Sequence, residues 1–351
     1  MKIGLLTSPG DAFAETMRHL ADFEAAGLHR LFIPEAYTFD SVSHLGAAAV
    51  RTTGVEIATG IMNVYSRTPA LIAMTAAGLD SVSGGRFILG LGASGPQVVE
   101  GFHGVPYAVP MARTREVIEI CRTVWRREPL AHDGDVFQIP LPARHSAAQR
   151  AARPLRLVER PLRRDIPIFL AALGPRNIEL AAELADGWLP TLYQPESAAA
   201  VFGPALARGA ARRPAGLGPL EIVVDAKLMI SEDPGELAAG YQRVREYLAL
   251  YVGGMGTRGK NFYHDLVCRY GYQSTAAEIE DLFRGGHKAA AAAAVPDALL
   301  RTVSLVGPPG HVAERIAALR ESGVTGINAA PVAATVAQRV RDIAALSEFV
   351  S

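Results

Sequence analysis

Residues 87–100 read Phe-Ile-Leu-Gly-Leu-Gly-Ala-Ser-Gly-Pro-Gln-Val-Val-Glu, an apolar run that ends in a glycine-rich turn. Its three glycines have the G-x-G-x-x-G spacing that, on the first strand of a βαβ unit, indicates a dinucleotide-binding fold. Here the turn follows the fourth strand-like run of the chain, and Gly101 and Gly104 interrupt the helix that should come next. No acidic residue stands where that fingerprint needs one. The stretch therefore argues against a Rossmann fold and for one strand of a different α/β architecture.

Outward from this stretch, apolar runs alternate with segments of helical periodicity along the whole chain. We expect eight strands, at residues 2–7, 30–34, 55–61, 86–93, 166–172, 188–192, 220–230 and 326–331. Eight strands, each followed by helical sequence, over this length predict an α/β fold, a (β/α)8 TIM barrel with insertions. In such a barrel the turn after the fourth strand lies where active sites are built, and glycines there would let the backbone approach a flat ring system.

The chain is expected to be a single TIM-barrel domain over residues 1–351 with two insertions. One is a loop at about 141–165, rich in proline and arginine. The other is helical material at about 241–302, which includes the alanine tract Ala289 to Ala294. Composition alone leaves that tract open between a lid helix and a tolerated linker.

Composition narrows the classes of function. Of the 351 residues, 49% are hydrophobic and 20% charged, as in soluble globular proteins. Lysine and arginine balance aspartate and glutamate at 35 each, which disfavours nucleic acid or an anionic membrane as partner and favours a small molecule. Cys121 and Cys268 belong to no C-x-x-C or Cys/His cluster, so we expect no metal site and no disulfide framework. With no signal-peptide or membrane-span pattern, the expected location is the cytoplasm.

Several motifs together resemble a known family. They are FILGLGASGPQVVEGFHG at 87–104, NVYSRTP at 63–69, IFLAALGPRN at 168–177 and ADGWLP at 185–190. The sequence resembles the bacterial luciferase-like superfamily, and within it the coenzyme F420-dependent oxidoreductases related to methylene-tetrahydromethanopterin reductase. The resemblance implies a deazaflavin cofactor, coenzyme F420, or alternatively flavin mononucleotide (FMN), which serves relatives with the same barrel. It also implies a homodimer.

The resemblance implies a cofactor site around the barrel mouth. It places a non-prolyl cis peptide, Gly60-Ile61, behind the deazaflavin ring; an ordinary glycine kink is the alternative. Two loop residues that follow, Asn63 and Arg67, would lie along the cofactor or stabilise the loop. The glycine-rich turn would contribute Gly92, Ala93 and Ser94. A phosphate group would meet the helix N-terminus at Ala172, Leu173, Gly174, Pro175 and Arg176, because free N–H groups there favour an anion.

Two carboxylates are the catalytic candidates. Glu35 ends the second strand, where relatives such as sugar-phosphate dehydrogenases have an Asp followed by a catalytic His; here the pair is Glu35-Ala36, without the imidazole. Glu100 matches an acid that relatives use near the ring, where an apolar wall would raise a carboxyl pKa as a general acid requires; a helix-surface carboxylate is the alternative.

Substrate-side candidates come from the loops and from one strand. Lys227 lies in an apolar strand, so its ammonium needs a partner. The others are Tyr37, Tyr65 and His264, each of which could equally be an ordinary loop or surface residue. Residues 143–154, ARHSAAQRAARP, depart from the glycine-rich loop of relatives and favour a changed substrate or a flap.

Three functions compete on this basis. The favoured one is an F420-dependent oxidoreductase that transfers a hydride between the deazaflavin and a small organic substrate, reducing a C=C or C=N type bond because no imidazole is present to take a hydroxyl proton. The alternatives are an FMN-dependent luciferase-like monooxygenase and a non-catalytic cofactor-binding protein.

Overall fold

The computed structural model describes residues 1–7, 13–147, 150 and 152–350. In this part of the chain, one sheet contains the strands β1 (Lys2–Leu6), β2 (Arg30–Ile33), β3 (Glu56–Thr59), β4 (Met62–Asn63), β5 (Phe87–Gly92), β8 (Ile168–Ala171), β9 (Gly187–Leu189), β10 (Glu221–Ile230), β11 (Leu305–Gly307) and β12 (Gly326–Pro331). A separate antiparallel pair consists of β6 (His132–Asp133) and β7 (Gln138–Ile139).

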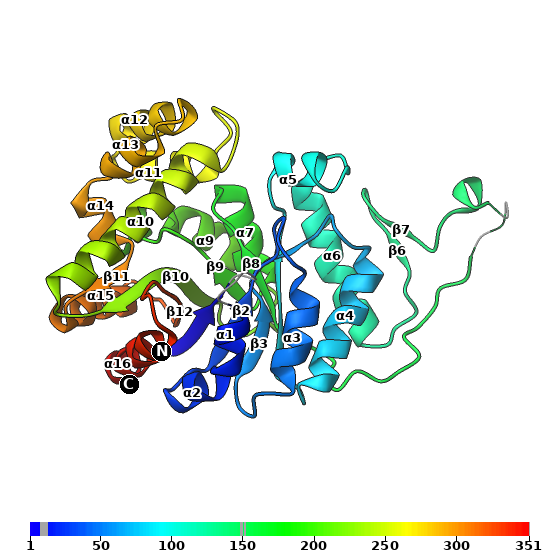
Figure 1. Cartoon of the computed structure of the whole chain (residues 1–351). Coiled ribbons are helices and arrows are strands. Elements are labelled where there is room, and N and C mark those ends of the chain that lie inside the picture. Colours follow the sequence, from blue (N-terminus) through cyan, green and yellow to red (C-terminus); the bar gives the residue numbers. More distant parts are fainter. Residues whose placement is uncertain (8–12, 148–149, 151, 351) are drawn as a thin grey trace.

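Helices follow most of the strands (Figure 1). In the first half of the chain they are α1 (Phe13–Arg18), α2 (Leu20–Ala25), α3 (Ser41–Ala49), α4 (Pro69–Val82), α5 (Pro96–Gly101), α6 (Pro110–Trp125) and the 3-10 helix η1 (Ala143–His145). In the second half they are α7 (Pro175–Leu184), α8 (Pro195–Val201), α9 (Gly203–Ala210), α10 (Pro234–Gly254), α11 (Phe262–Arg269), α12 (Gln273–Arg284), α13 (Lys288–Ala293), α14 (Asp297–Thr302), α15 (Pro309–Glu321) and α16 (Val336–Val350).

The large sheet closes into a parallel barrel. Its order is β1-β2-β3-β5-β8-β9-β10-β12, and β12 pairs with β1 to complete the circle. Two short strands lie beside this circuit, because β4 continues β3 along β5 and β11 pairs with the end of β10. The prediction of a (β/α)8 barrel is therefore confirmed.

One face of each strand fills the barrel interior with apolar side chains. The residues that meet there are Phe32, Ala58, Ile88, Phe169, Leu189 and Val223, contributed by six different strands. Near the strand beginnings Arg30, 2% exposed, lies with its guanidinium 5.2 Å from the Phe169 ring centre and pairs with Glu56 (2.6 Å) and Glu221 (2.8 Å). These residues close the N-terminal end of the interior, so the opposite end is the one open to a ligand.

A β-bulge explains two of the glycines in the stretch at 87–100. Ala58 pairs with Ile88 and Met62 with Leu91, so the β3–β4 side has one residue more than β5. A Cβ at position 90 would lie 1.7 Å from the Thr59 carbonyl oxygen, and one at position 92 would lie 2.6 Å from Ile61 Cγ2. These two glycines accommodate the bulge of the neighbouring strand. The approach of this turn to a flat ring stays a prediction.

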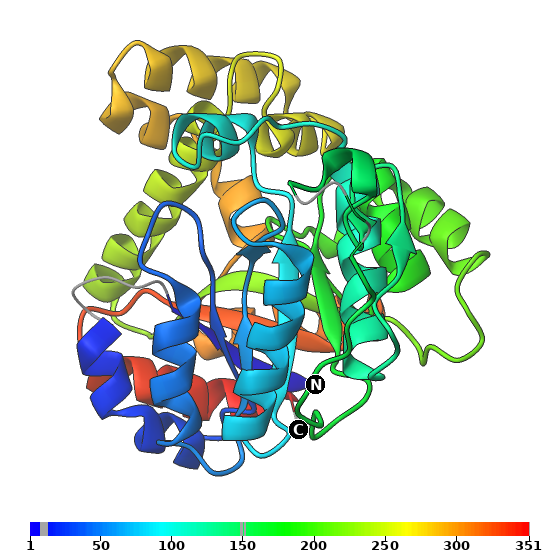
Figure 2. The same cartoon turned by 90° about the vertical axis from the view of Figure 1, so that its right-hand side faces the viewer.

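The helical insertion lies over one end of the barrel. Figures 1 and 2 both place α11, α12 and α13 at the same end as α5, which follows the glycine-rich turn. The alanine tract forms α13, and Ala291 and Ala292 are buried in it. The tract is therefore a packed helix, and its role as a lid stays a prediction.

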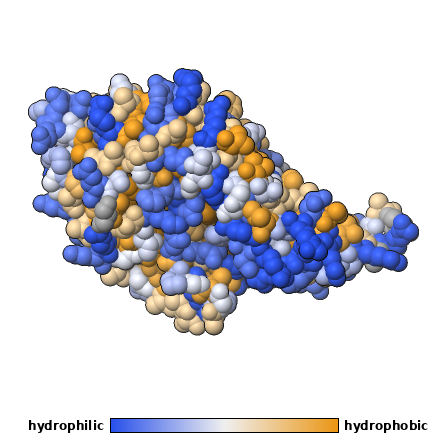
Figure 3. Space-filling view, turned by 90° about the horizontal axis from the view of Figure 1, so that it is seen from below, coloured by the Kyte–Doolittle hydropathy of each residue, from blue (hydrophilic) through white to orange (hydrophobic). Residues whose placement is uncertain are grey.

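The other insertion is an arm that projects from the body of the molecule (Figures 1 and 3). It carries β6, β7 and η1, and it begins before the predicted boundary at about residue 141. Glu116 of α6 anchors it, because its carboxylate accepts hydrogen bonds from the N–H groups of Val136 (3.1 Å) and Phe137 (2.8 Å). Residues 148, 149 and 151 of the Arg/Ala-rich loop lie outside the described residues. Within the described residues, no helix combines the length and apolarity that crossing a membrane would need.

Candidate active site

The barrel mouth, formed where the strands end, brings several predicted cofactor residues together. The N–H of Glu35, after β2, donates to the Ile61 carbonyl at 2.8 Å, and the N–H of Val64 donates to the Gly92 carbonyl at 3.1 Å. Asn63 pairs with Gly92 in the β4–β5 register. These contacts join the ends of β2, β4 and β5 into one wall of the mouth. Ala93 and Ser94 follow directly, with Ser94 at a φ of 58°.

Asn63 contributes an unpaired donor to this wall. Its side chain is 2% exposed, and its Oδ1 accepts the Tyr65 N–H at 2.9 Å. Its Nδ2 has no hydrogen-bond partner among the described residues. A buried N–H group without a partner costs free energy, on the order of 1–3 kcal/mol, which a ligand acceptor would recover.

The β8–α7 turn forms the phosphate-side candidate. The Ala172 carbonyl accepts the Trp188 Nε1–H at 2.8 Å, which fixes the end of β8. Gly174 is the N-cap of α7 and has no side chain to cap it, and Pro175 is the first helical residue. No described residue accepts from the N–H groups of Arg176 and Asn177, which could therefore bind a ligand acceptor. Across the turn, the Arg269 guanidinium of α11 donates to the Leu173 carbonyl at 3.1 Å.

One implied feature is not found. The cis peptide bond in the described residues is Ile139–Pro140, and the Gly60–Ile61 bond is trans. On either side of this bond the Gly60 N–H donates to the Ile33 carbonyl at 3.0 Å, and the Ile61 carbonyl accepts the Glu35 N–H. The irregularity at this point is the one-residue bulge, which avoids the roughly 3–4 kcal/mol that a non-prolyl cis bond costs.

Glu35 and Arg67, predicted for separate roles, form an ion pair. Arg67 donates to both carboxylate oxygens, at 2.6 and 2.9 Å, and Glu35 also accepts from the N–H and Oγ–H of Ser41 at the start of α3. Both side chains are largely buried. Both oxygens of Glu35 therefore help to hold two loops together, and its catalytic role stays a prediction.

Glu100 is exposed on α5 and accepts the Tyr107 N–H at 3.0 Å. The expectation of a carboxyl against an apolar wall is corrected, because α5 turns this side chain towards solvent. The helix-surface alternative describes it.

The other substrate candidates are dispersed. Tyr65 is buried, its hydroxyl donates to the Ala108 carbonyl at 2.7 Å, and the Arg113 guanidinium lies 4.5 Å from its ring centre. Tyr37 is 61% exposed, with its ring 6.4 Å from that of Phe102. His264 faces other lid residues, with Nε2 3.9 Å from a Glu280 carboxylate oxygen. Of these three residues, Tyr37 is the one whose side chain is exposed and could contact a ligand.

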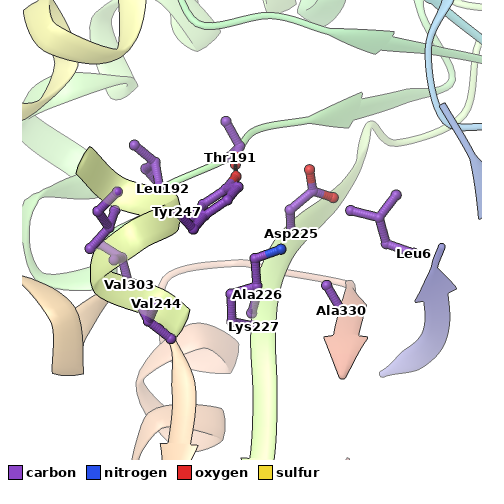
Figure 4. A pocket seen from close by; sticks show the side chains of 11 residues that line it. Leu6, Thr191, Leu192, Asp225, Ala226, Lys227, Val244, Tyr247, Val303 and Ala330 are labelled. Carbon is purple, nitrogen blue, oxygen red and sulfur yellow. Dashed lines mark hydrogen bonds between the residues drawn. The ribbon is translucent and has the colours of Figure 1, made fainter. Parts of the chain in front are cut away.

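Lys227 faces a small recess inside the mouth, lined among others by Leu6, Thr191 and Ala330. Figure 4 shows its side chain and that of Asp225 on the same side of β10, between Tyr247 of α10 and Leu6. The Lys227 Nζ lies 4.2 Å from the Tyr247 ring centre. Burial lowers the pKa of Lys227, and the nearby Asp225 charge opposes that shift.

Sequence reasoning missed Asp225, which lines the same recess. Burial raises its pKa to about 7, although a hydrogen bond from Asn328 Nδ2 (2.9 Å) and the charge of Lys227 both act to lower it. The pattern that identified Lys227 could have found it. Successive side chains of a strand alternate between its faces, so a residue two before an inward lysine points inward as well.

Comparisons with known proteins identify relatives of this chain. The family model described as "Luciferase-like monooxygenase" matches residues 1–326. A Mycobacterium tuberculosis protein named "Putative coenzyme F420-dependent oxidoreductase" is 40% identical over 355 residues, covering 99% of each chain. The 5,10-methylenetetrahydromethanopterin reductase of Archaeoglobus fulgidus is 27% identical, covering 93% of this chain and 92% of that one. The solved F420-dependent tetrahydromethanopterin reductase of Methanopyrus kandleri has the same fold, with a TM-score of 0.80 at 21% identity over 99% of this chain and 98% of that one.

Proposed function

We propose, on the premise that this chain belongs to the luciferase-like monooxygenase family, that it is a coenzyme F420-dependent oxidoreductase. In our proposal it transfers a hydride between the deazaflavin and a small organic substrate, and it acts on a C=C or C=N type bond. The observation that carries the proposal is the end-to-end identity of 40% with a protein named for that cofactor and activity.

The residues at the mouth fit such a cofactor. Asn63 Nδ2 is a buried donor without a partner, and the uncapped N-terminus of α7 offers the N–H groups of Arg176 and Asn177. A deazaflavin ring carries acceptor atoms, and its tail carries phosphate, which suits a helix N-terminus. When bound, the cofactor supplies the hydride. The protein's part is to bind and orient it, to cover the mouth with α11–α13, and to move one proton.

The type of bond follows from what the mouth lacks. The position after Glu35 is Ala36, and Glu35 itself is held by Arg67 and Ser41. Position 36 therefore supplies no imidazole to take a hydroxyl proton, which favours a double-bond substrate over an alcohol. Reduction of a polarised double bond needs a proton donor instead, for which the recess beside Lys227 has a candidate group.

Equilibrium binding tests the cofactor. We would titrate the protein with oxidised F420 and, in parallel, with FMN, and follow fluorescence quenching. We expect F420 to bind in the micromolar range and FMN at least tenfold more weakly. Asn63→Asp keeps the acceptor for the Tyr65 N–H and removes the orphan donor, so it should weaken F420 binding by tenfold or more; Glu100→Gln is the matched control. Tighter binding of FMN would favour the monooxygenase instead.

Turnover tests the chemistry. Reduced F420 would be mixed with 2-cyclohexen-1-one as a C=C probe and 1-pyrroline as a C=N probe, and oxidation of the deazaflavin followed by absorbance. We expect at least one probe to be reduced, and oxidised F420 with 2-propanol to give no reaction. Tight F420 binding without turnover of either probe would favour the non-catalytic binding protein.

A further inference from the structure

The position of Asp225 on β10 directs its side chain into the barrel mouth. Val223, two residues earlier, belongs to the apolar cluster that fills the barrel interior. Because inward residues recur every second position, Asp225 and Lys227 continue that inner face towards the C-terminal end. The Asp225 N–H donates to the Pro190 carbonyl at 3.1 Å, just beyond β9. The carboxyl therefore stands directly above the apolar filling, at the floor of the recess.

The carboxyl of Asp225 is held through one oxygen and free at the other. Oδ1 accepts the Asn328 Nδ2–H at 2.9 Å, and Asn328 lies on the adjacent β12, in register with Asp225. Oδ2 has no hydrogen-bond partner in the part of the chain that the structure describes. Of the three carboxyls Glu35, Glu100 and Asp225, Asp225 is the one that lines the recess, whereas Glu35 is paired with Arg67 and Glu100 is exposed on a helix.

The ionisable groups that face Asp225 are few. They are Lys227 on β10, Tyr247 and Tyr251 on α10, and Tyr263 on α11. Burial raises the pKa of each of the three tyrosines, so their hydroxyls keep their protons at neutral pH. Burial also raises the pKa of Asp225 to about 7. Among these groups, Asp225 is thus the carboxyl that can hold a proton near neutrality and release it.

We propose that Asp225 is the proton-transfer residue of this site, with Asn328 as its positioning residue. The proposal rests on the proposed function. When a hydride adds to one atom of a C=C or C=N bond, the π bond breaks and its electron pair moves to the other atom or its conjugated oxygen. That atom takes the proton from the Asp225 carboxyl, and the O–H bond breaks. The Lys227 ammonium stabilises the carboxylate left behind, which regains a proton from water.

Asn328 gives the carboxyl its orientation. Its Nδ2 binds Oδ1, and its own Oδ1 is buried without a partner among the described residues. The Asn328 amide therefore donates to Oδ1 of Asp225, and Oδ2 of Asp225 is the oxygen that faces the recess. Such an arrangement holds a proton-carrying oxygen in one direction, which general acid catalysis requires.

A spectroscopic titration tests the protonation of Asp225 without cofactor. Infrared difference spectra of the full-length protein would be recorded as pH is raised, following the C=O stretch of protonated carboxyls. We expect a band that disappears near pH 7 and is missing from Asp225→Asn. Asp342, the other buried carboxyl with a pKa raised by burial, to about 6, provides the control, because Asp342→Asn should keep the Asp225 band. Identical wild-type and Asp225→Asn spectra would overturn the proposal.

Kinetics tests the transfer itself. With reduced F420 and the two double-bond probes, we expect the kcat of wild type to fall as pH rises through about 7. The kcat of Asp225→Asn should be lower by about a hundredfold or more and should no longer depend on pH in this range. F420 binding by Asp225→Asn should stay within threefold of wild type, Asp225→Glu should recover part of kcat, and Asn328→Ala should shift the pH midpoint.

The two proposals fail in different ways. Failure of the wild-type protein to bind F420 would refute the proposed function and leave the infrared result standing. Turnover by wild type with an unchanged rate and pH profile in Asp225→Asn would refute the role of Asp225 and leave the proposed function intact.

Discussion

The buried carboxyl of Asp225 makes a prediction about stability that needs neither cofactor nor substrate. In the folded protein its pKa is about 7, against an ordinary value of 3.8. The folded state therefore binds this proton more tightly than the unfolded chain does. The stabilisation is fully present below pH 3.8 and is lost as pH rises through about 7. At about 1.36 kcal/mol per unit of pKa, the whole effect is about 4 kcal/mol, of which about 3 kcal/mol falls between about pH 5 and pH 8.

Replacing Asp225 with Asn removes the titrating group and keeps the size and one acceptor. The free energy of unfolding of wild type minus that of Asp225→Asn should therefore fall by about 3 kcal/mol from about pH 5 to about pH 8. Urea unfolding followed by the fluorescence of the buried Trp125 and Trp188 measures it. Asp342 titrates in both proteins and cancels from the difference. A difference that stays constant across this range would refute the assignment of a buried, proton-holding carboxyl to position 225.

The remaining predictions concern the framework of the mouth and the assembly. Glu35→Gln leaves Arg67 without its counter-charge, so it should lower the free energy of unfolding by about 2–4 kcal/mol in urea titrations, whereas Glu100→Gln should change it by less than about 0.5 kcal/mol. Gly90→Ala puts a Cβ onto the Thr59 carbonyl and should abolish soluble expression, while Gly95→Ala, which meets nothing within 4 Å, should express and melt like wild type. The homodimer stays a prediction: Leu71, Met74 and Val82 expose one apolar face of α4, so light scattering should give twice 37.2 kDa and Met74→Glu should give the monomer; a wild-type monomer would contradict it.

The barrel could be predicted from sequence because its strands are runs of apolar residues bounded by turns. The runs at 2–7, 30–34 and 220–230 correspond closely to β1, β2 and β10. The strands that were missed are β4, β6, β7 and β11, with two or three residues each. A strand this short spans too few residues for an alternating pattern to be recognised in the sequence.

The sequence predicts where the site lies better than it predicts what each residue does there. Asn63, Gly92 and the 172–176 turn all lie at the carboxyl ends of barrel strands, where the sequence places them. The ion pair between Glu35 and Arg67 could not be predicted, because the two residues are 32 positions apart and only the fold brings them together. The same limit applies to Gly90, whose need for a missing Cβ comes from a bulge in the neighbouring strand. Local patterns mark where the chain turns, and contacts across strands decide what each side chain does.

The charge cluster around Arg30 bears on how the chain is made. Arg30 and Glu56 are 26 residues apart, but Glu221 follows Arg30 by 191 residues. At translation rates of about 5–20 residues per second, roughly 10–40 seconds pass between the synthesis of Arg30 and that of its second carboxylate partner, Glu221. During that time the nascent half-barrel holds an arginine with one partner and an interior still open to water. The bidentate contact with Glu221 can form only when the second half of the barrel arrives, so it ties the last stage of synthesis to the closing of the sheet.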